Sequence, residues 1–230
     1  MRRVARKNGL KLAEFTTRSD QMESVPVFFN AIYLDVPAQA VYRRMGYRKG
    51  LTTITQEQEE EIRNAMSHAA ALIELKGSTL VLPVDSISGE KISLRTGAVL
   101  RSTGVARMLK GSSEVLFMGA TAGNGIMEGI RHESDAGNLT RAVVFDAVAS
   151  EMTDKALDWI VGHIGRDLRR RGKELSARRF SAGYGDFALE NQKIMYENLK
   201  LWEIGVQITD SFVLVPEKSV TALAGISVST

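Results

Sequence analysis

The chain has 230 residues, of which 44% are hydrophobic and 25% are charged, a composition typical of a globular domain. It contains no cysteine, which excludes disulfides, thiolate metal ligands and cysteine nucleophiles. No apolar run approaches the roughly 20 residues that cross a bilayer, so neither a membrane span nor a secretory signal is expected. We therefore expect a cytoplasmic protein.

Positive charge is concentrated at the start of the chain. Residues 1–20 contain six Arg or Lys against Glu14 and Asp20, a net charge of +4, so the other residues together carry −1. A basic segment of this size can bind RNA or an acidic protein surface, or it can be a solvated extension. No aromatic interleaving indicates a nucleic-acid platform, so nucleic acid is not the expected partner. We expect residues 1–30 to be a basic extension and residues 31–230 to be one domain.

Two helices are predicted in the first third of the chain. A short helix over 38–45 is closed by Gly46. Thr55 and Gln58 have the spacing of a capping box, which predicts a second helix that runs from there to about residue 75. The apolar positions of this second helix repeat at helical spacing, so one face is expected to be buried: Ile62, Met66, Ala69, Ala70 and Ile73.

Residues 79–119 read as a β-rich region that is interrupted by one helix over 103–110. The predicted strands are Thr79–Val84, Lys91–Leu94 and Glu114–Met118. A long helical region follows over 139–170, which exceeds an ordinary helix, and a bend is expected near Ser150. Near-alternation of apolar residues at the C-terminus predicts further strands, with 216–219 as the turn of a hairpin. This order of elements indicates an α+β domain.

The glycine cluster between Gly119 and Gly125 follows a predicted strand and precedes a predicted helix. A turn of this kind can cradle a phosphate in a dinucleotide fold. Here Glu128 occupies the position of the third small residue, and no regular parallel βαβ series surrounds the cluster. The simpler interpretation is a strand-to-helix turn.

No metal site is predicted. The histidines are not spaced as a pair of ligands on one helix, and no cysteine accompanies them. They are His68, His132 and His163. The sequence also lacks a nucleophile elbow and a Walker motif, so hydrolase and nucleotide-triphosphatase functions are not indicated.

Residues 179–184, Arg-Phe-Ser-Ala-Gly-Tyr, carry the strongest chemical pattern of the chain. Arg179 can hold a carboxylate with two parallel hydrogen bonds. Gly183 allows a close backbone approach to a ligand or a turn with positive φ, and Tyr184 offers a ring and a hydroxyl. The group suits a small ligand with a carboxylate and a flat ring. A surface Arg, a turn Gly and a half-buried Tyr give the same spacing by accident, so the spacing alone does not decide.

Three further pieces follow this motif in order. They are an amphipathic helix over 187–202, the segment Ile-Gly-Val-x-Ile-Thr-x-Ser-Phe at 204–212, and Pro216 with Ser-Val-x-Ala at 219–222. Upstream pieces are Val41–Arg48, Ala120–Gly123 and Asp146-Ala147. Over about residues 34–226 the chain resembles the activation domain of cobalamin-dependent methionine synthase. This resemblance implies a curved antiparallel β-sheet with helices packed around it.

The resemblance also implies a ligand, S-adenosylmethionine, and residues that hold it. Arg179 and the backbone of Gly183 grip the ligand, with Ser181 and Ala182 between them, while Tyr184 packs nearby. Carboxylates that balance the ammonium and the sulfonium come from Glu151, Asp154 and Asp35. Ser150 aligns more naturally than Glu151 with the helix residue of the fused enzyme.

The implied function is the rescue of a cofactor. Cobalamin on methionine synthase is occasionally oxidised to an inactive cobalt(II) state, and the activation domain presents the methyl of S-adenosylmethionine while a donor such as flavodoxin supplies an electron. No general acid or base is required. The chain has no corrinoid, folate or homocysteine module, so a free-standing reactivation subunit that acts in trans is expected. The alternatives are an S-adenosylmethionine-binding accessory of another corrinoid-dependent methyltransferase and a nucleic-acid-binding module that uses the basic tail.

Overall fold

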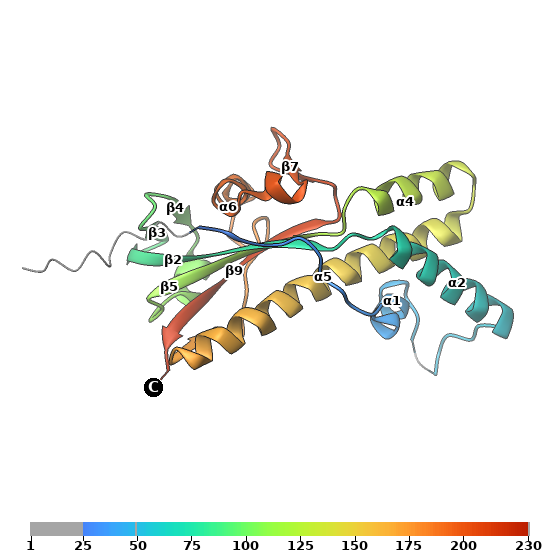
Figure 1. Ribbon diagram of the computed structural model, residues 1–230, viewed down its shortest axis with the longest axis horizontal. Coiled ribbons are helices and arrows are strands. Elements are labelled where there is room, and N and C mark those ends of the chain that lie inside the picture. The colour runs from blue at the N-terminus through green and yellow to red at the C-terminus, as the bar shows by residue number, and fades with distance from the viewer. Residues whose placement is uncertain (1–24, 49, 230) are drawn as a thin grey trace, which may run out of the picture.

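The molecule is built on a curled antiparallel sheet that helices cover on both faces (Figure 1). The computed structural model describes residues 25–48 and 50–229. Its main strands are β1 Val27–Phe29, β2 Lys76–Ser88, β3 Lys91–Leu94, β4 Val99–Arg101, β5 Glu114–Thr121, β6 Lys173–Leu175 and β9 Ser219–Val228. In this described part the strands follow the order β4-β3-β2-β5-β9-β6, with β1 paired to β2. The expected fold class, α+β with a curved antiparallel sheet, is confirmed.

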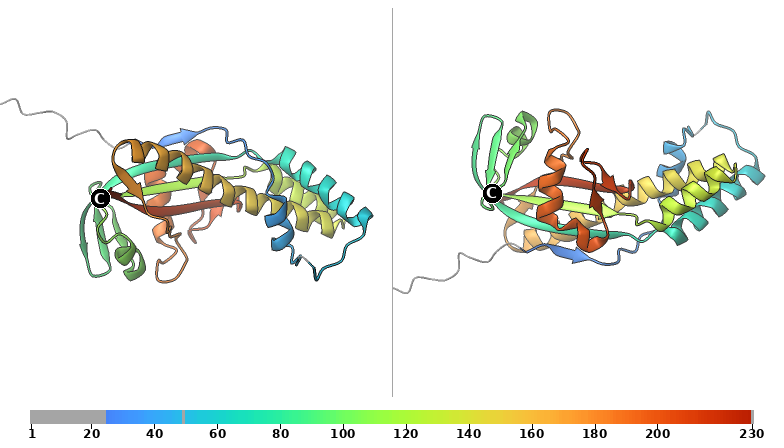
Figure 2. Two further views of the ribbon diagram at one scale, coloured as in Figure 1. Left: turned by 90° about the horizontal axis from the view of Figure 1, so that it is seen from below. Right: turned by 90° about the horizontal axis from the view of Figure 1, so that it is seen from above.

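Helices pack against both faces of the sheet. They are α1 Ala38–Arg44, α2 Gln56–Leu72, α3 Thr103–Met108, α4 Gly125–Asp135, α5 Leu139–Arg170, α6 Asn191–Leu199 and the 3-10 helix η1 Leu201–Ile204. Figure 2 shows α5 in front of the strands from below and α6 in front of them from above. Because side chains alternate along a strand, Met118 of β5 faces the α5 side and Phe117 faces the α6 side. Each face of the sheet therefore has its own apolar core.

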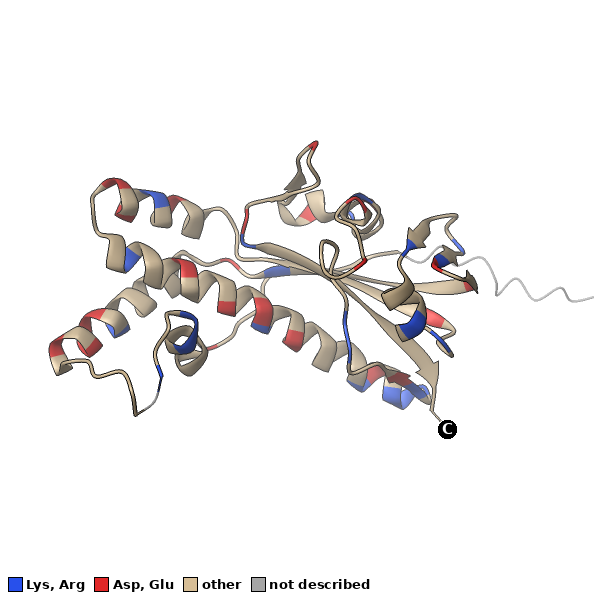
Figure 3. Cartoon of the chain, turned by 180° about the vertical axis from the view of Figure 1, so that it is seen from behind, with Lys and Arg blue, Asp and Glu red and all other residues tan. Residues whose placement is uncertain are grey.

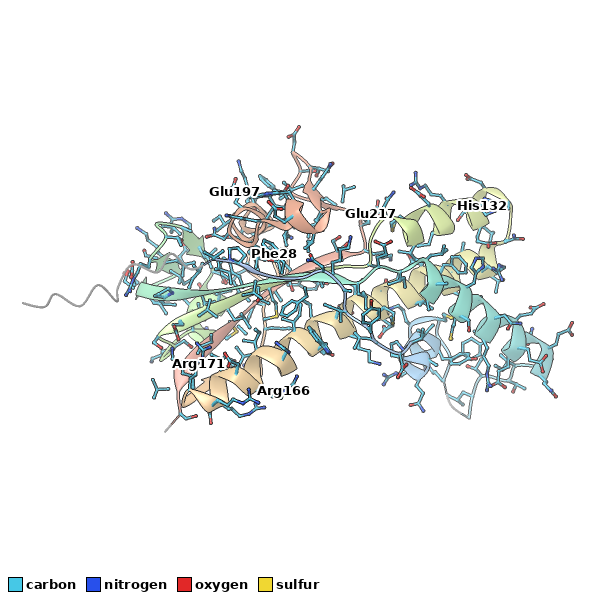
Figure 4. All side chains as sticks on the ribbon, in the orientation of Figure 1. Phe28, His132, Arg166, Arg171, Glu197 and Glu217 are labelled. Atoms are coloured by element: carbon cyan, nitrogen blue, oxygen red, sulfur yellow. The ribbon has the colours of Figure 1, made fainter. Side chains whose placement is uncertain are left out.

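Helix α5 is a single uninterrupted helix, and it has no break at Ser150. It can lie close to the sheet because Gly77 of β2 has no side chain: a Cβ there would be 2.7 Å from Ile160 Cδ1. Figure 4 shows Arg166 and Arg171 at the C-terminal end of the helix, where the helix dipole favours positive charge.

The capping box that begins α2 is confirmed. The hydroxyl of Thr55 accepts the backbone N–H of Gln58 at 3.2 Å, and the Gln58 side chain accepts the N–H of Thr55 at 3.0 Å. The helix ends at Leu72, three residues before the expected end. The chain leaves the helix there because the N–H of Glu74 donates to the carbonyl of Ala122, beside the glycine turn.

The predicted C-terminal hairpin turn at 216–219 is wrong. The hairpin is formed by β7, Gln207–Ile208, and β8, Leu214–Val215, so its turn lies upstream. That turn is tight because the Thr209 hydroxyl accepts the N–H of Val213 at 3.1 Å. Ser219 instead begins β9, which pairs with β5 and β6. The predicted helix over 187–202 is also shorter: α6 begins at Asn191, and it ends at Leu199 because Lys200 adopts a left-handed conformation before η1.

The glycine cluster forms the expected strand-to-helix turn between β5 and α4. Gly123 has a positive φ of 81°, and its N–H donates to the Thr121 hydroxyl at 3.1 Å. Because β5 is antiparallel to both of its neighbours, a dinucleotide fold is excluded here.

Most of the range expected as a basic extension, residues 1–24, lies outside the described residues. Within the rest of that range, β1 pairs with β2 through Phe28 and Ser78. None of the described helices combines the length and the apolar content that crossing a membrane requires.

Candidate functional site

Three carboxylates follow one another along α5 and define what we call the acidic row: Glu151, Asp154 and Asp158. Their spacing of three and four residues places them on one side of the helix. Figure 3 shows acidic residues in succession along this helix. The row contains both helix carboxylates predicted from the sequence and adds Asp158, which was not predicted.

Arg44, in the last turn of α1, binds the row. Its Nε is 2.6 Å from Oε1 of Glu151, and its Nη2 is 3.3 Å from Oδ2 of Asp154. Burial raises the pKa of the Asp154 carboxyl, and the positive charge of Arg44 opposes this shift only in part. Glu151 and Asp154 are therefore brought together, and a cation of the protein itself already holds them.

Arg179, which follows β6 in the chain, also contacts the acidic row. Its Nη1 donates to Oδ1 of Asp158 at 2.6 Å, and its side chain is 34% exposed. No hydrogen bond to the described residues uses Nε or Nη2. That edge of the guanidinium matches the two oxygens of a carboxylate. The side chain thus lies against α5, and among the described residues Nε and Nη2 have no hydrogen-bond partner.

The segment after Arg179 crosses the edge of the sheet. Phe180 forms a β-bridge with Leu223 of β9, with hydrogen bonds of 3.0 and 2.8 Å in the two directions. Its ring packs in the core beneath α6, whereas Arg179 points to the α5 side. The motif therefore joins the two faces of the sheet.

The glycine and tyrosine of the motif form a tight turn beyond this bridge. Gly183 has a φ of 89°, and its N–H donates to the carbonyl of Phe187 at 2.7 Å. Ala182 is buried, Ser181 is half-buried and the Tyr184 side chain is 72% exposed. No hydrogen bond or ion pair of the described residues joins Tyr184 to the acidic row. The structure places Tyr184 within the motif turn and does not bring it into contact with the carboxylates.

Asp35 lies beside α5 through its backbone. The carbonyl of Asp35 accepts a hydrogen bond of 2.8 Å from Nζ of Lys155, the neighbour of Asp154. The Asp35 carboxylate itself is exposed. It is near the acidic row but outside the ion pairs that form the row.

Lys218 joins three sequence motifs that were noted separately. Its Nζ is 2.7 Å from Oδ1 of Asp146 and 2.9 Å from Oγ of Ser150, and its side chain is only 16% exposed. Its carbonyl accepts the N–H of Ala122 at 2.8 Å. Ser150, the alternative to Glu151, is therefore already bonded to Lys218.

Two cavities of the described residues lie away from this group. One of about 560 Å³ is between the β2–β3 hairpin and α3, and one of about 250 Å³ is between α2 and α5. Neither is lined by the acidic row or by residues 179–184. Within residues 25–48 and 50–229, no three His, Asp or Glu side chains are arranged to hold a metal ion. Arg44, Arg179 and the acidic row place positive and negative charges side by side at the surface.

Comparison with known proteins identifies the fold. No family model matches the sequence, and no curated protein matches it. The structure is similar to the crystal structure of the MetH reactivation domain bound to AdoHcy, with a TM-score of 0.63 and 10% sequence identity. The match covers 88% of this chain and 79% of that one. The chain therefore has the fold of the MetH reactivation domain.

Proposed function

We propose that the chain binds S-adenosylmethionine and supports the reductive remethylation of cobalamin on a separate methionine synthase. The observation that carries this proposal is the meeting of Arg179 with the acidic row, where Arg179 Nη1 is 2.6 Å from Asp158. A cation beside several carboxylates matches an amino-acid group, which has one negative and one positive charge. The likeness to a reactivation domain that was crystallised with AdoHcy supports this ligand class.

The charges suggest how the ligand is oriented. Its carboxylate takes the open edge of Arg179, formed by Nε and Nη2. Its ammonium takes the carboxylates of Glu151 and Asp154, which Arg44 holds in the absence of ligand. Ligand binding is then an exchange of one cation for another, so the two carboxylates keep a partner throughout.

The remaining predicted residues complete the site. The backbone of Ser181, Ala182 and Gly183 and the ring of Tyr184 contact the rest of the ligand. The exposed carboxylate of Asp35 adds negative charge near the row. This excess of carboxylates favours a ligand that also carries a sulfonium.

S-adenosylmethionine supplies a methyl group that its sulfonium makes transferable. The residues of this chain bind and orient the ligand, and none has to act as a general acid or base. The proposed partners are a corrinoid-binding methyltransferase and a flavodoxin-like electron donor.

Two measurements test the proposal. Titration calorimetry with S-adenosylmethionine is expected to give one site per chain, and the absence of binding heat would contradict the ligand. Addition of the chain, S-adenosylmethionine and a reductant to an oxidised methionine synthase is expected to restore turnover. Binding without recovery of the synthase, together with recovery of another corrinoid methyltransferase, would identify the chain as an accessory of that other system.

A further inference from the structure

Asp186 lies two residues beyond the Arg-x-x-x-Gly-Tyr motif and contacts a helix distant in sequence. Its carboxylate accepts the Ser102 hydroxyl at 2.8 Å and the backbone N–H of Thr103 at 2.7 Å. It also accepts the N–H of Gly104, at 3.1 Å from Oδ2. These hydrogen bonds lower the pKa of the Asp186 carboxyl, so it remains ionised.

The donors belong to the first turn of α3, where backbone N–H groups have no partner within the helix. Ser102 is the N-cap residue, and its hydroxyl also accepts the N–H of Val105 at 2.9 Å. Asp186 therefore completes the cap of α3 with a charge from another part of the chain. An Asn at this position would present one acceptor oxygen and an amino group to three donors, so it cannot replace the contact.

The fit between the two segments is close. A Cβ on Gly104 would be 2.8 Å from Oδ1 of Asp186 and 3.2 Å from the ring of Phe180. Gly104 thus permits both the carboxylate contact and the packing of the motif against α3. The contact can therefore be disturbed by a substitution at Asp186 or by one at Gly104.

Two anchors hold the ends of the motif. At its start Phe180 is bridged to Leu223 in β9, and at its end Asp186 is bonded to α3. Between the anchors the backbone turns through Gly183 and Gly185, both with positive φ. Glycines lose more conformational freedom on ordering than other residues do, so this stretch is held by its anchors together with the hydrogen bond from Gly183 to Phe187 and the buried Phe187 side chain.

We propose that Asp186 is a positioning residue that holds the segment from Arg179 to Tyr184 in the conformation that binds the ligand. This inference rests on the proposed function of that segment. Asp186 does not contact the ligand, because its carboxylate is occupied by the three donors of α3. It acts by reducing the conformational freedom that the segment loses on binding.

The first test is Asp186→Asn, with Asp210→Asn in the exposed β7–β8 turn as the matched control. We expect the affinity for S-adenosylmethionine to fall about tenfold, the worth of one hydrogen bond to a charged group. We also expect faster hydrogen exchange in residues 181–187 and unchanged exchange in β5 and β9. A folded Asp186→Asn variant that binds like the parent would overturn the proposal.

The second test approaches the same contact from α3. Gly104→Ala should weaken binding by a similar factor, whereas Gly162→Ala, whose Cβ would have only an ordinary contact, should not. The double variant Asp186→Asn with Gly104→Ala should bind no more weakly than either single variant, because both disrupt one contact. Additive losses would contradict a shared contact, and Gly104→Ala serves alone where Asp186→Asn does not fold.

The outcomes separate this inference from the proposed function. If the parent chain does not bind S-adenosylmethionine, the proposed function is contradicted. The inference then concerns only whether Asp186 orders the segment. Hydrogen exchange without ligand decides this question. Unchanged exchange of residues 181–187 in Asp186→Asn would overturn the positioning role itself.

Discussion

Arg44 and Glu151 are 107 positions apart in the sequence, yet Nε of Arg44 lies 2.6 Å from Oε1 of Glu151. The same guanidinium reaches Asp154 in the next turn of α5. One side chain of α1 therefore neutralises two of the carboxylates that we propose hold the ligand ammonium. Since the guanidinium and the ammonium cannot occupy the same place, the ion pair and the ligand compete.

This competition predicts that Arg44→Gln binds S-adenosylmethionine more tightly than the parent. The variant leaves Glu151 and Asp154 without a cation, so the ligand no longer has to displace one. Calorimetry measures the change, and Arg63→Gln, which removes an exposed pair with Glu59 on α2, is the control. Weaker binding by Arg44→Gln would instead make Arg44 a direct contact of the ligand.

Arg179→Ala is expected to abolish S-adenosylmethionine binding and to leave the melting temperature of the ligand-free protein nearly unchanged. The ion pair with Asp158 is partly exposed, so its loss should change the free energy of unfolding by less than about 1 kcal/mol. The neighbouring exposed residue supplies the control, Arg178→Ala. Equal binding by Arg179→Ala and the parent would remove Arg179 from the site, and loss of folding would show that it is structural.

Local signals predicted much of the fold. The capping box at Thr55 and the run of helix-compatible residues over 139–170 both act within a few turns of chain, and both elements formed. The hairpin turn failed for the opposite reason. Whether Ser219 turns back on β8 or continues into β9 depends on pairing with β5, about 100 positions earlier in the chain, and no local pattern contains that information.

The candidate site shows the same division. The motif at 179–184 and the carboxylates of α5 were visible as residue types at a given spacing. The partners that fix their positions were not, because Arg44 and Lys218 come from segments that meet α5 only in the folded chain. Asp158 alone had a local signal, since it lies four residues after Asp154 on the same helical face.

The partial desolvation of Asp154, whose side chain is 52% exposed, predicts a small pH-dependent effect of Asp154→Asn on stability. Burial raises the pKa of this carboxyl above its unfolded value, so its contribution to stability is present at acid pH and is lost as the pH rises through the folded pKa. The amide has no charge to desolvate. The stability of Asp154→Asn relative to the parent should therefore be greater at pH 7 than at pH 3.

Urea unfolding of both proteins at the two pH values measures this difference. Asp210→Asn, outside the acidic row, is the control for the change of net charge. A relative stability of Asp154→Asn that falls on going from pH 3 to pH 7 would show that the ion pair with Arg44 outweighs the cost of burial.

Lys218→Met should destabilise the fold more than the loss of an exposed ion pair does. Methionine fills a similar volume but leaves Asp146 and Ser150 without their cation, and this contact fastens α5 to the start of β9. Because Lys218 is mostly buried while Asp146 is half exposed, we expect a loss of about 1–2 kcal/mol in the free energy of unfolding. Lys193→Met, which breaks an exposed pair on α6, should cost less than about 0.5 kcal/mol. Urea unfolding measures both losses. If Lys218→Met and Lys193→Met lower the free energy of unfolding equally, the Lys218 contact does not stabilise the packing of α5.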